Sequence, residues 1–255
     1  GITYAEFSYT LIQGYDFLHL FKDKGCILQA AGSDQWGNIT TGIELIKKIE
    51  GKEAYGFTMP LILDANGNKF GKSEGNALWL DKTKTSSYEL YQYLINSDDS
   101  KVEEYLKVFT FLTKEEIEKI MTEHNDAPHL RIAQKRLAKE FITDLHGEEE
   151  FNKALKISEC LFSGKINELT KEEIEDAFKG VPTFNLILNE TILDTLVNNK
   201  IAVSKREARE FLTNNSITIN GEKINDENTI INENLLLHKK YLIIRKGKKK
   251  YYIGK

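Results

Sequence analysis

The stretch that decides the fold of this chain is Gly32-Ser33-Asp34-Gln35-Trp36-Gly37-Asn38. It follows an apolar segment at residues 26–31, which predicts a buried strand. It precedes residues 39–49, whose apolar side chains recur at helical spacing and predict a helix. Asn38 stands where its side chain can cap that helix. A strand, a glycine-flanked turn and a helix in this order form half of a βαβ unit, so the sequence predicts an α/β fold with a parallel sheet.

The turn carries a carboxylate and an amide. Ligands of open α/β sheets bind beyond the carboxyl ends of the strands, and Asp34 and Gln35 stand at such a position. An Asp can accept hydrogen bonds from a ribose diol, and a Gln can contact a carboxylate or carbonyl oxygen. Gly32 and Gly37 permit close approach of the backbone to a ligand, and Gln29 in the strand could point the same way. The alternative is an ordinary turn with a helix cap.

A second polar segment is Lys69-Phe70-Gly71-Lys72-Ser73, which follows a predicted strand at residues 57–63 and a turn signal at Asn66-Gly67. Its two lysines can neutralise the charge that develops on a leaving pyrophosphate during nucleotidyl transfer. The hydroxyl of Ser73 adds a donor, and the glycines at 71 and 75 permit a loop that closes over the phosphates.

Two alternatives remain for this second segment. A P-loop needs G-x-x-x-x-G-K-[ST] ahead of a helix. Its first glycine would fall at Asn66, and residues 74–80 lack the spacing of an amphipathic helix. The other alternative is a solvated basic turn.

Residues 2–21 predict a helix with a polar face formed by Tyr9, Gln13 and Asp16, at positions i, i+4 and i+7. The other faces are mostly apolar, so the helix is expected to be buried nearly all round. A buried Gln and Asp need hydrogen-bond partners. Either other protein groups or a ligand would supply them.

The middle of the chain predicts a mostly helical domain, and Pro182 and the residues up to 189 mark a linker. Two capping boxes start at Thr113 and Thr170. The last block predicts two short helices, a hairpin around Asn220-Gly221 and three further strands. The predicted helices of the middle block are 88–94, 102–111, 115–121, 131–145 and 149–161, and the last block has helices at 191–199 and 204–214, a hairpin at 217–224 and strands at 235–237, 241–244 and 251–253.

Charge and cysteine content narrow the class of protein. The 255 residues carry a net charge of −4, but residues 200–255 hold 13 Lys and Arg against 6 Asp and Glu. This basic end indicates either a polyanion partner or a solvated lysine-rich tail. Cys26 and Cys160 form no CxxC pair, which predicts a reducing, cytoplasmic location without a disulfide framework or bound metal. No apolar run reaches the length of a membrane span.

With these residues assembled, the chain resembles the bacterial-type tyrosyl-tRNA synthetases, which are class I aminoacyl-tRNA synthetases. The resemblance runs along the whole chain, and the two polar segments in this order are its most specific part. Lys69 to Ser73 resembles the second class I signature, KMSKS, although Phe70 and Gly71 depart from that consensus. The other matching stretches are residues 9–16 (YTLIQGYD), 105–112 (YLKVFTFL) and 245–252 (RKGKKKYY).

The resemblance implies a role for each candidate residue. Tyr9 and Gln13 would hold the α-amino group of L-tyrosine, and Asp16 would accept a hydrogen bond from its phenol. Gln35 would face the substrate carboxylate, with Gln29 as a secondary contact. The remaining implied roles are adenylate binding by Gly32 and Asp34, and stabilisation of the transition state of ATP attack by Lys69, Lys72 and Ser73.

The resemblance also implies the domains and partners. Residues 1–85 would be the C-terminal part of a Rossmann-like catalytic domain, 86–180 a helical anticodon-side domain and 184–255 a small α+β RNA-binding domain of a type first seen in a ribosomal protein. Lys205, Arg206 and Arg209 would meet phosphates of the tRNA for tyrosine. ATP with Mg²⁺ would be the co-substrate, and the full-length family implies a homodimer.

One family feature is missing from the sequence. No histidine begins the His-Ile-Gly-His type signature that grips ATP; the five are His19, His124, His129, His146 and His238. We therefore expect a chain that lacks the N-terminal part of the catalytic domain and cannot form tyrosyl-adenylate alone. Two alternatives stay open: a non-catalytic RNA-binding protein, and the tryptophanyl relative, which explains Asp16 less well.

Overall fold

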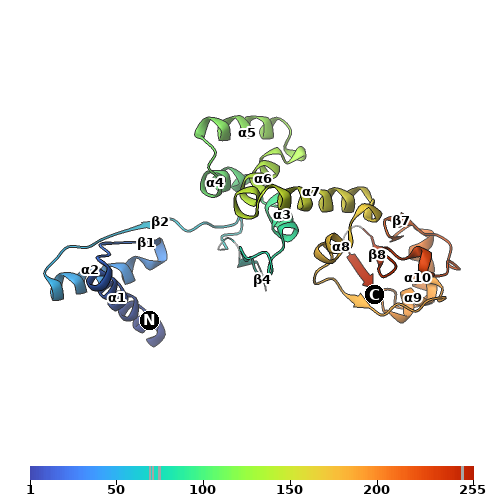
Figure 1. Ribbon diagram of the computed structural model, residues 1–255, viewed down its shortest axis with the longest axis horizontal. Helices are drawn as coiled ribbons and strands as arrows, with labels where there is room; N and C mark the ends of the chain where they lie inside the picture. Colours follow the sequence, from blue (N-terminus) through green and yellow to red (C-terminus); the bar gives the residue numbers. More distant parts are fainter. Residues whose placement is uncertain (69, 71, 74–75, 248–249) are drawn as a thin grey trace. The chain divides into compact units, whose positions relative to one another are not determined.

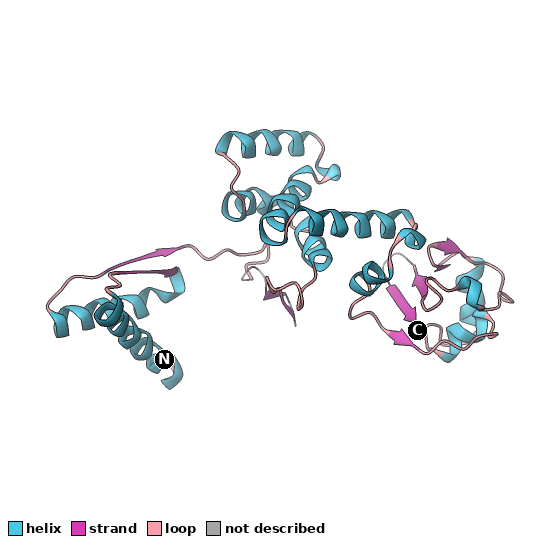
Figure 2. Ribbon diagram, in the orientation of Figure 1, coloured by secondary structure: helices cyan, strands magenta, loops and turns pink. Residues whose placement is uncertain are grey.

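The computed structural model describes residues 1–68, 70, 72–73, 76–247 and 250–255 (Figure 1). The chain divides into two compact units, Gly1–Ala77 and Leu78–Lys255. Figure 2 shows that helices dominate both units and that the strands are short. The division into three domains at residues 85 and 180 stays a prediction. None of the helices that the structure describes has the length and apolar content needed to span a bilayer.

The first unit contains the predicted half of a βαβ unit. Strands β1 and β2 are parallel, with Leu28 opposite Tyr55 and Gly32 opposite Met59. Between them lies a short 3₁₀ turn and then a helix, as the glycine-flanked turn predicted. The bounds are α1 (Tyr4–Lys24), β1 (Leu28–Gly32), η1 (Ser33–Gln35), α2 (Trp36–Glu50), β2 (Tyr55–Met59), β3 (Lys72–Ser73) and β4 (Asn76–Ala77).

Helix α1 packs closely on α2 because glycines face each other across the contact. A Cβ atom on Gly42 would lie 2.8 Å from Phe17 Cδ1, and one on Gly14 would lie 3.0 Å from Thr41 Cγ2. Phe17, with Leu18, Ile46 and Ala54, forms the apolar core of this contact. The small residues therefore set the spacing of the two helices.

The prediction that the first helix is buried nearly all round is wrong. Only Gly14, Phe17 and Leu18 are buried, whereas the side chains of Tyr4, Ile12 and Tyr15 are 85%, 68% and 67% exposed. Helix α1 packs mainly on α2, and one neighbouring helix covers only one face of a 21-residue helix.

Two further predictions in this unit are wrong. The strand at residues 26–31 is not fully buried, since Leu28 is 49% exposed and burial alternates along β1. Asn38 does not cap a helix, because α2 begins at Trp36 with Gln35 as its N-cap residue. The side chain of Asn38 instead points to α1 and η1, where it makes three hydrogen bonds.

The second unit begins with the predicted helical block. Each of the five helices predicted between 88 and 161 is present, and the capping boxes at Thr113 and Thr170 are both formed. A third capping box, at Ser86 and Glu89, opens the first of them. The bounds are α3 (Ser87–Ile95), α4 (Asp99–Phe109), α5 (Lys114–Asp126), η2 (Pro128–Leu130), α6 (Ile132–His146), α7 (Glu148–Ser163), η3 (Ile166–Glu168) and α8 (Lys171–Ala177).

The C-terminal part is a five-stranded sheet in the order β5-β9-β8-β6-β7 with two helices. The predicted helices and the hairpin at Asn220-Gly221 are confirmed. The predicted strand at 235–237 is wrong, because Asn232 accepts hydrogen bonds from Asn234 N and Leu235 N and caps a 3₁₀ turn. The bounds are β5 (Thr183–Phe184), α9 (Ile192–Asn198), α10 (Lys205–Thr213), β6 (Ile217–Ile219), β7 (Glu222–Lys223), η4 (Glu233–Leu235), β8 (Leu242–Lys246) and β9 (Lys250–Gly254).

One apolar core joins the end of the helical block to this sheet. Ile157 of α7 and Ile174 of α8 cluster with Ile243 of β8 and Ile253 of β9. The sheet also packs on α9 and α10 through a second cluster, which includes Leu196 and Leu212. The helical block and the sheet are therefore packed as parts of one unit.

Candidate functional site

Asn38 is the centre of the candidate site in the first unit. Its Nδ2 donates to Gln13 Oε1 at 2.9 Å and to Gln35 Oε1 at 3.0 Å. Its Oδ1 accepts from the hydroxyl of Thr10 at 2.9 Å. The amide thus ties two predicted substrate-binding residues, Gln13 on α1 and Gln35 on η1, into one half-buried cluster.

A cavity of about 490 Å³ lies beside this cluster, and Tyr9, Asp34 and Asn38 line it. The structure therefore brings together Tyr9, predicted to hold an amino group, and Asp34, predicted to hold a ribose. Gly32 is needed for this arrangement, because a Cβ atom there would lie 2.9 Å from Asp34 Oδ1 and 2.8 Å from Leu61 Cδ2. An oxygen-rich wall of this kind can accept hydrogen bonds from hydroxyl and ammonium groups.

Gln29 and Asp16, the other two predicted substrate-binding residues, are not among the residues that line this cavity. Gln29 Oε1 is buried and has no hydrogen-bond partner in the described part of the chain. A buried amide oxygen without a partner is costly, so this atom is suited to a ligand donor. Asp16 is exposed, which corrects the expectation that its carboxylate is buried.

The predicted phosphate loop is described only in part. Lys69, Gly71 and Gly75 lie outside the described residues. Lys72 and Ser73 form β3, which pairs antiparallel with β4, Lys72 opposite Ala77. Because a hairpin and not a helix follows, the segment lacks the strand–loop–helix context of a P-loop.

The turn ahead of this loop is confirmed. Asp64 Oδ1 accepts from Asn68 N at 2.8 Å and Asn66 N at 2.9 Å, and Gly67 has φ +83°. The hydrogen bond from the backbone of Asn68 is the main cause that lowers the pKa of Asp64. The charged side chain of Asp64 therefore holds the turn that leads into the two-lysine segment.

The predicted RNA-binding residues lie on α10, whose N-cap is Ser204. Two of the three cations already have acidic neighbours, with Lys205 2.7 Å from Asp194 and Arg209 2.5 Å from Glu227. The Lys205 hydrogen bond is the main cause that lowers the pKa of Asp194. Arg206 is exposed. These ion pairs reduce the free positive charge that the helix offers to phosphates.

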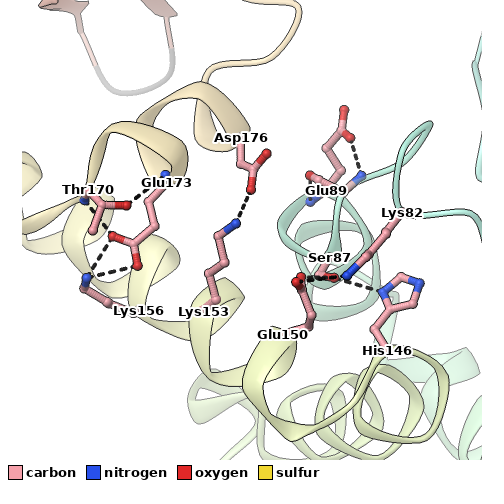
Figure 3. A network of polar contacts seen from close by, with 11 residues as sticks. Lys82, Ser87, Glu89, His146, Glu150, Lys153, Lys156, Thr170, Glu173 and Asp176 are labelled. Atoms are coloured by element: carbon pink, nitrogen blue, oxygen red, sulfur yellow. Dashed lines mark hydrogen bonds and ion pairs between the residues drawn. The ribbon is translucent and has the colours of Figure 1, made fainter.

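A polar network in the second unit was not predicted (Figure 3). The Ser87 hydroxyl lies 2.9 Å from both His146 Nδ1 and Glu150 Oε2, and Lys82 pairs with Glu150 at 3.4 Å. Burial on its own raises the pKa of Glu150, but the hydrogen bonds from Ser87 and Lys82 outweigh it and lower the pKa. The serine stands between the histidine and the carboxylate, so this is not the order of a nucleophilic triad.

This network instead joins the segment before α3 to the helical block. His146 Nε2 lies 2.8 Å from the carbonyl oxygen of Leu80, so two residues of that segment, Leu80 and Lys82, are held by α6 and α7. The only sequence signal for it was the capping box at Ser86, which places Ser87 at the first position of α3. Within the described residues, no group of three or more His, Cys, Asp and Glu side chains is arranged to hold a metal ion.

Comparisons with known proteins agree with the resemblance. The family model "tRNA synthetases class I (W and Y)" matches residues 1–163, and the model "Tyrosine--tRNA ligase SYY-like C-terminal domain" matches residues 173–253. Tyrosine--tRNA ligase 2 of Enterococcus faecalis is 51% identical over 257 residues, which are 100% of this chain and 61% of that protein. Tyrosine--tRNA ligase of Geobacillus stearothermophilus is 51% identical over 255 residues, 99% of this chain and 61% of that protein.

A solved structure is similar as well. The C-terminally truncated mitochondrial tyrosyl-tRNA synthetase of Aspergillus nidulans matches with a TM-score of 0.53 and 40% identity, over 64% of this chain and 46% of that one. The chain thus spans 61% of the length of the curated relatives above. It belongs to the class I tRNA synthetases and, within them, to the bacterial-type tyrosyl-tRNA synthetases.

Proposed function

We propose that this chain is part of a tyrosine–tRNA ligase, which activates L-tyrosine with ATP and transfers it to the 3′ end of its tRNA. The observation that carries the proposal is the Asn38 cluster, which joins Gln13 and Gln35 beside a cavity lined by Tyr9 and Asp34. RNA binding alone needs none of these side chains. The names and matched lengths of the relatives support the same activity.

We propose that the cluster orients the amino acid. Asn38 holds the oxygens of Gln13 and Gln35 toward itself, so the Nε2 group of Gln35 is turned away and can donate to the substrate carboxylate. The Tyr9 phenol and the second lone pair of Gln13 Oε1 would accept from the α-amino group. Asp16 would accept from the substrate phenol, and Gln29 Oε1 would gain the partner that it lacks.

We propose that the phosphates of ATP lie over the two-lysine segment. The tyrosine carboxylate would attack the α-phosphorus in line, and pyrophosphate would leave with the bonding electron pair. Asp34 and the backbone at Gly32 would hold the ribose. Mg²⁺ would enter bound to ATP. Lys69, Lys72 and Ser73 would stabilise the negative charge that develops on the pyrophosphate, and this is positioning and electrostatic catalysis without a covalent enzyme intermediate.

We propose three properties of the whole enzyme beyond its chemistry. Its tRNA would be that for tyrosine, bound partly through Arg206 and its neighbours on α10. It would act in the cytoplasm, which the free thiols of Cys26 and Cys160 support. It would form a homodimer, and the exposed apolar side chains of α1 support a further protein contact on that unit.

The test is thermal unfolding with added amino acids. L-tyrosine is expected to raise the melting temperature of the chain, while L-phenylalanine and L-tryptophan at equal concentration do not, because a ligand that binds only the native state stabilises it. The Asn38→Leu variant should lose most of that shift. If tyrosine gives no shift although tRNA binds, the second candidate, a non-catalytic RNA-binding chain, replaces the ligase.

A further inference from the structure

The chain enters the helical block through a short segment, residues 78–86, which we call the strap. Hydrogen bonds within the strap give it a defined shape: Asp81 Oδ1 accepts from Thr83 N at 2.9 Å, and Trp79 N donates to Thr85 Oγ1 at 2.9 Å. The backbone N–H of Thr85 also donates to the carbonyl oxygen of Asp81 at 3.1 Å. These bonds hold the strap together independently of the helices around it.

Side chains of the surrounding elements hold backbone carbonyls of the strap. Lys179, which follows α8, donates from Nζ to Thr83 O at 3.2 Å and to Lys84 O at 3.0 Å. His146, at the end of α6, lies with Nε2 2.8 Å from Leu80 O. A lysine ammonium brings three donors, whereas an imidazole brings one or two, according to its protonation. The histidine anchor is therefore the one whose hydrogen bonding changes with its protons.

The single hydrogen of the Ser87 hydroxyl fixes how many protons the full set of contacts needs (Figure 3). The carbonyl of Leu80 can only accept, so Nε2 of His146 carries a proton. Ser87 Oγ lies 2.9 Å from both His146 Nδ1 and Glu150 Oε2. If the hydroxyl hydrogen points to Glu150, Nδ1 must donate to Oγ, and the ring carries two protons. If it points to Nδ1, Ser87 Oγ and Glu150 Oε2 face each other with no hydrogen between them.

The second arrangement requires a protonated Glu150, and the surroundings of this carboxyl oppose that. Burial raises the pKa of Glu150, but the hydrogen bonds from Ser87 and Lys82 outweigh it and lower the pKa. An ionised carboxylate accepts hydrogen bonds and donates none. The contacts of His146 with Leu80 and Ser87, and of Ser87 with the carboxylate, are therefore satisfied together only by a doubly protonated imidazole.

The other charged groups at this place are carboxylates and ammonium groups. Besides Lys82 and Glu150, the elements that meet at the ring carry Asp81 and Lys84 on the strap, Glu89 on α3, Asp144 on α6, Glu149 and Lys153 on α7, and Lys179 after α8. Among side chains, histidine is the one whose charge ordinarily changes between about pH 5 and about pH 8. A change of the strap within this range therefore reports on the protonation of His146.

We propose that His146 is a proton-dependent latch on the strap. With two ring protons it donates to Leu80 and to Ser87, and the Ser87 hydroxyl is left to donate to Glu150. When Nδ1 loses its proton, one of the two hydrogen bonds of Ser87 is lost and the bond to Leu80 loses its charged donor, so the strap opens more often. A proton that binds more tightly to the closed form stabilises it at low pH, and that stability is lost as the pH rises.

The experiment measures hydrogen exchange of the 255-residue chain by mass spectrometry, with rates corrected for the intrinsic effect of pH. Protection of the strap is expected to fall about 10-fold between about pH 5.5 and about pH 8, the effect of losing one hydrogen bond to a charged group. Peptides from α9 are the internal control and should keep their protection.

Two substitutions separate the latch from a general effect of pH. His146→Gln has one donor and one acceptor, like the neutral ring, so the strap should be weakly protected at both pH values. Its matched control, His129→Gln at an exposed histidine of η2, should behave like the parent.

The sharper variant is Glu150→Gln. Its amide can donate to Ser87 Oγ, which frees the hydroxyl hydrogen for Nδ1 and satisfies the neutral ring as well as the charged one. The strap should therefore stay protected at both pH values. Circular dichroism checks that the variants fold, and the parent and Glu150→Gln still test the latch if His146→Gln does not.

Three outcomes would contradict the inference. Equal protection of the strap at both pH values in the parent would show that there is no latch. If His146→Gln keeps the fall in protection, another group produces it. If Glu150→Gln keeps it, the count of protons at Ser87 is wrong. None of these measurements uses L-tyrosine or tRNA, so the latch and the proposed function fail separately.

Discussion

The side chain of Asn38 on α2 donates to Gln13 Oε1 on α1 across 2.9 Å. This hydrogen bond crosses the contact between the two helices of the first unit, at the edge of the cavity that Tyr9 lines. The same nitrogen also holds Gln35. One amide therefore links the packing of α1 on α2 to the position of two candidate substrate-binding side chains.

We predict that Asn38→Leu lowers the free energy of unfolding of the first unit by about 1–3 kcal/mol, because three half-buried polar side chains lose a partner. Urea unfolding followed by Trp36 fluorescence in a Trp79→Phe background measures this unit. Asn152→Leu, at an exposed helical asparagine of α7, is the matched control and should change little. Equal stability of Asn38→Leu and the parent would show that the cluster contributes nothing.

The contact between Gly221 and Gly164 gives a second prediction. A Cβ atom on Gly221 would lie 1.7 Å from the carbonyl oxygen of Gly164, and Gly221 has φ +92°. Gly221→Ala therefore combines backbone strain with a clash against main chain. It should destabilise the second unit severely, by about 3 kcal/mol or more.

The control for that substitution is Gly180→Ala. Gly180 has φ +77° but nothing within 4 Å of an added Cβ atom. It should lose only about 1–2 kcal/mol from the left-handed backbone. Thermal unfolding of the two variants separates the clash from the strain, and equal melting temperatures would remove the steric argument.

Acid titration tests the ion pair of Glu173 with Lys156, which lie 2.8 Å apart (Figure 3). Burial alone raises the pKa of Glu173, but the hydrogen bonds from Lys156 and from the backbone of Thr170 outweigh it and lower the pKa below 4.5. A lowered pKa in the folded state gives stability that is present above the unfolded pKa and is lost as the pH falls through the folded pKa.

Glu173→Gln should therefore be less stable than the parent at pH 7. The difference in unfolding free energy should shrink as the pH is lowered below 4.5. Urea unfolding between pH 3 and pH 7 measures it, with Glu172→Gln as the control for charge removal from the same turn. A difference that does not vary with pH would mean that the carboxylate acts by shape alone.

Alkaline titration tests the environment of Tyr88. Burial and, less strongly, the neighbouring Tyr251 raise the pKa of Tyr88 to about 12. The fold thus favours the neutral phenol. The stability that comes from this preference is present below the pKa of the unfolded state and is lost as the pH rises toward 12. Absorbance at 295 nm follows the ionisation of tyrosines as the pH is raised. Tyr88→Phe should remove one tyrosine from the group that ionises at the highest pH, and Tyr251→Phe should lower the pH at which Tyr88 ionises. An unchanged late fraction in Tyr88→Phe would contradict the assignment.

Local sequence predicted most elements of the second unit. Helical spacing between 88 and 161 located five helices, and Thr113 and Thr170 marked two helix starts within one residue. These predictions are confirmed because they depend on near neighbours in the sequence: a capping box joins residues three apart, and a helix face repeats every three or four residues. The strand predicted at 235–237 failed for a related local reason, since the side chain of Asn232 bends that segment into a 3₁₀ turn.

The sequence by itself therefore determined where the helices and the glycine-flanked turn lie, and it singled out Tyr9, Gln13 and Asp34 as candidate site residues. Only the tertiary structure decided that α1 is largely exposed and that Asn38 tethers two glutamines where a helix cap was expected. The reason is physical: hydrogen bonds between near neighbours follow from local spacing, whereas burial and side-chain partners depend on which distant surface packs against each face.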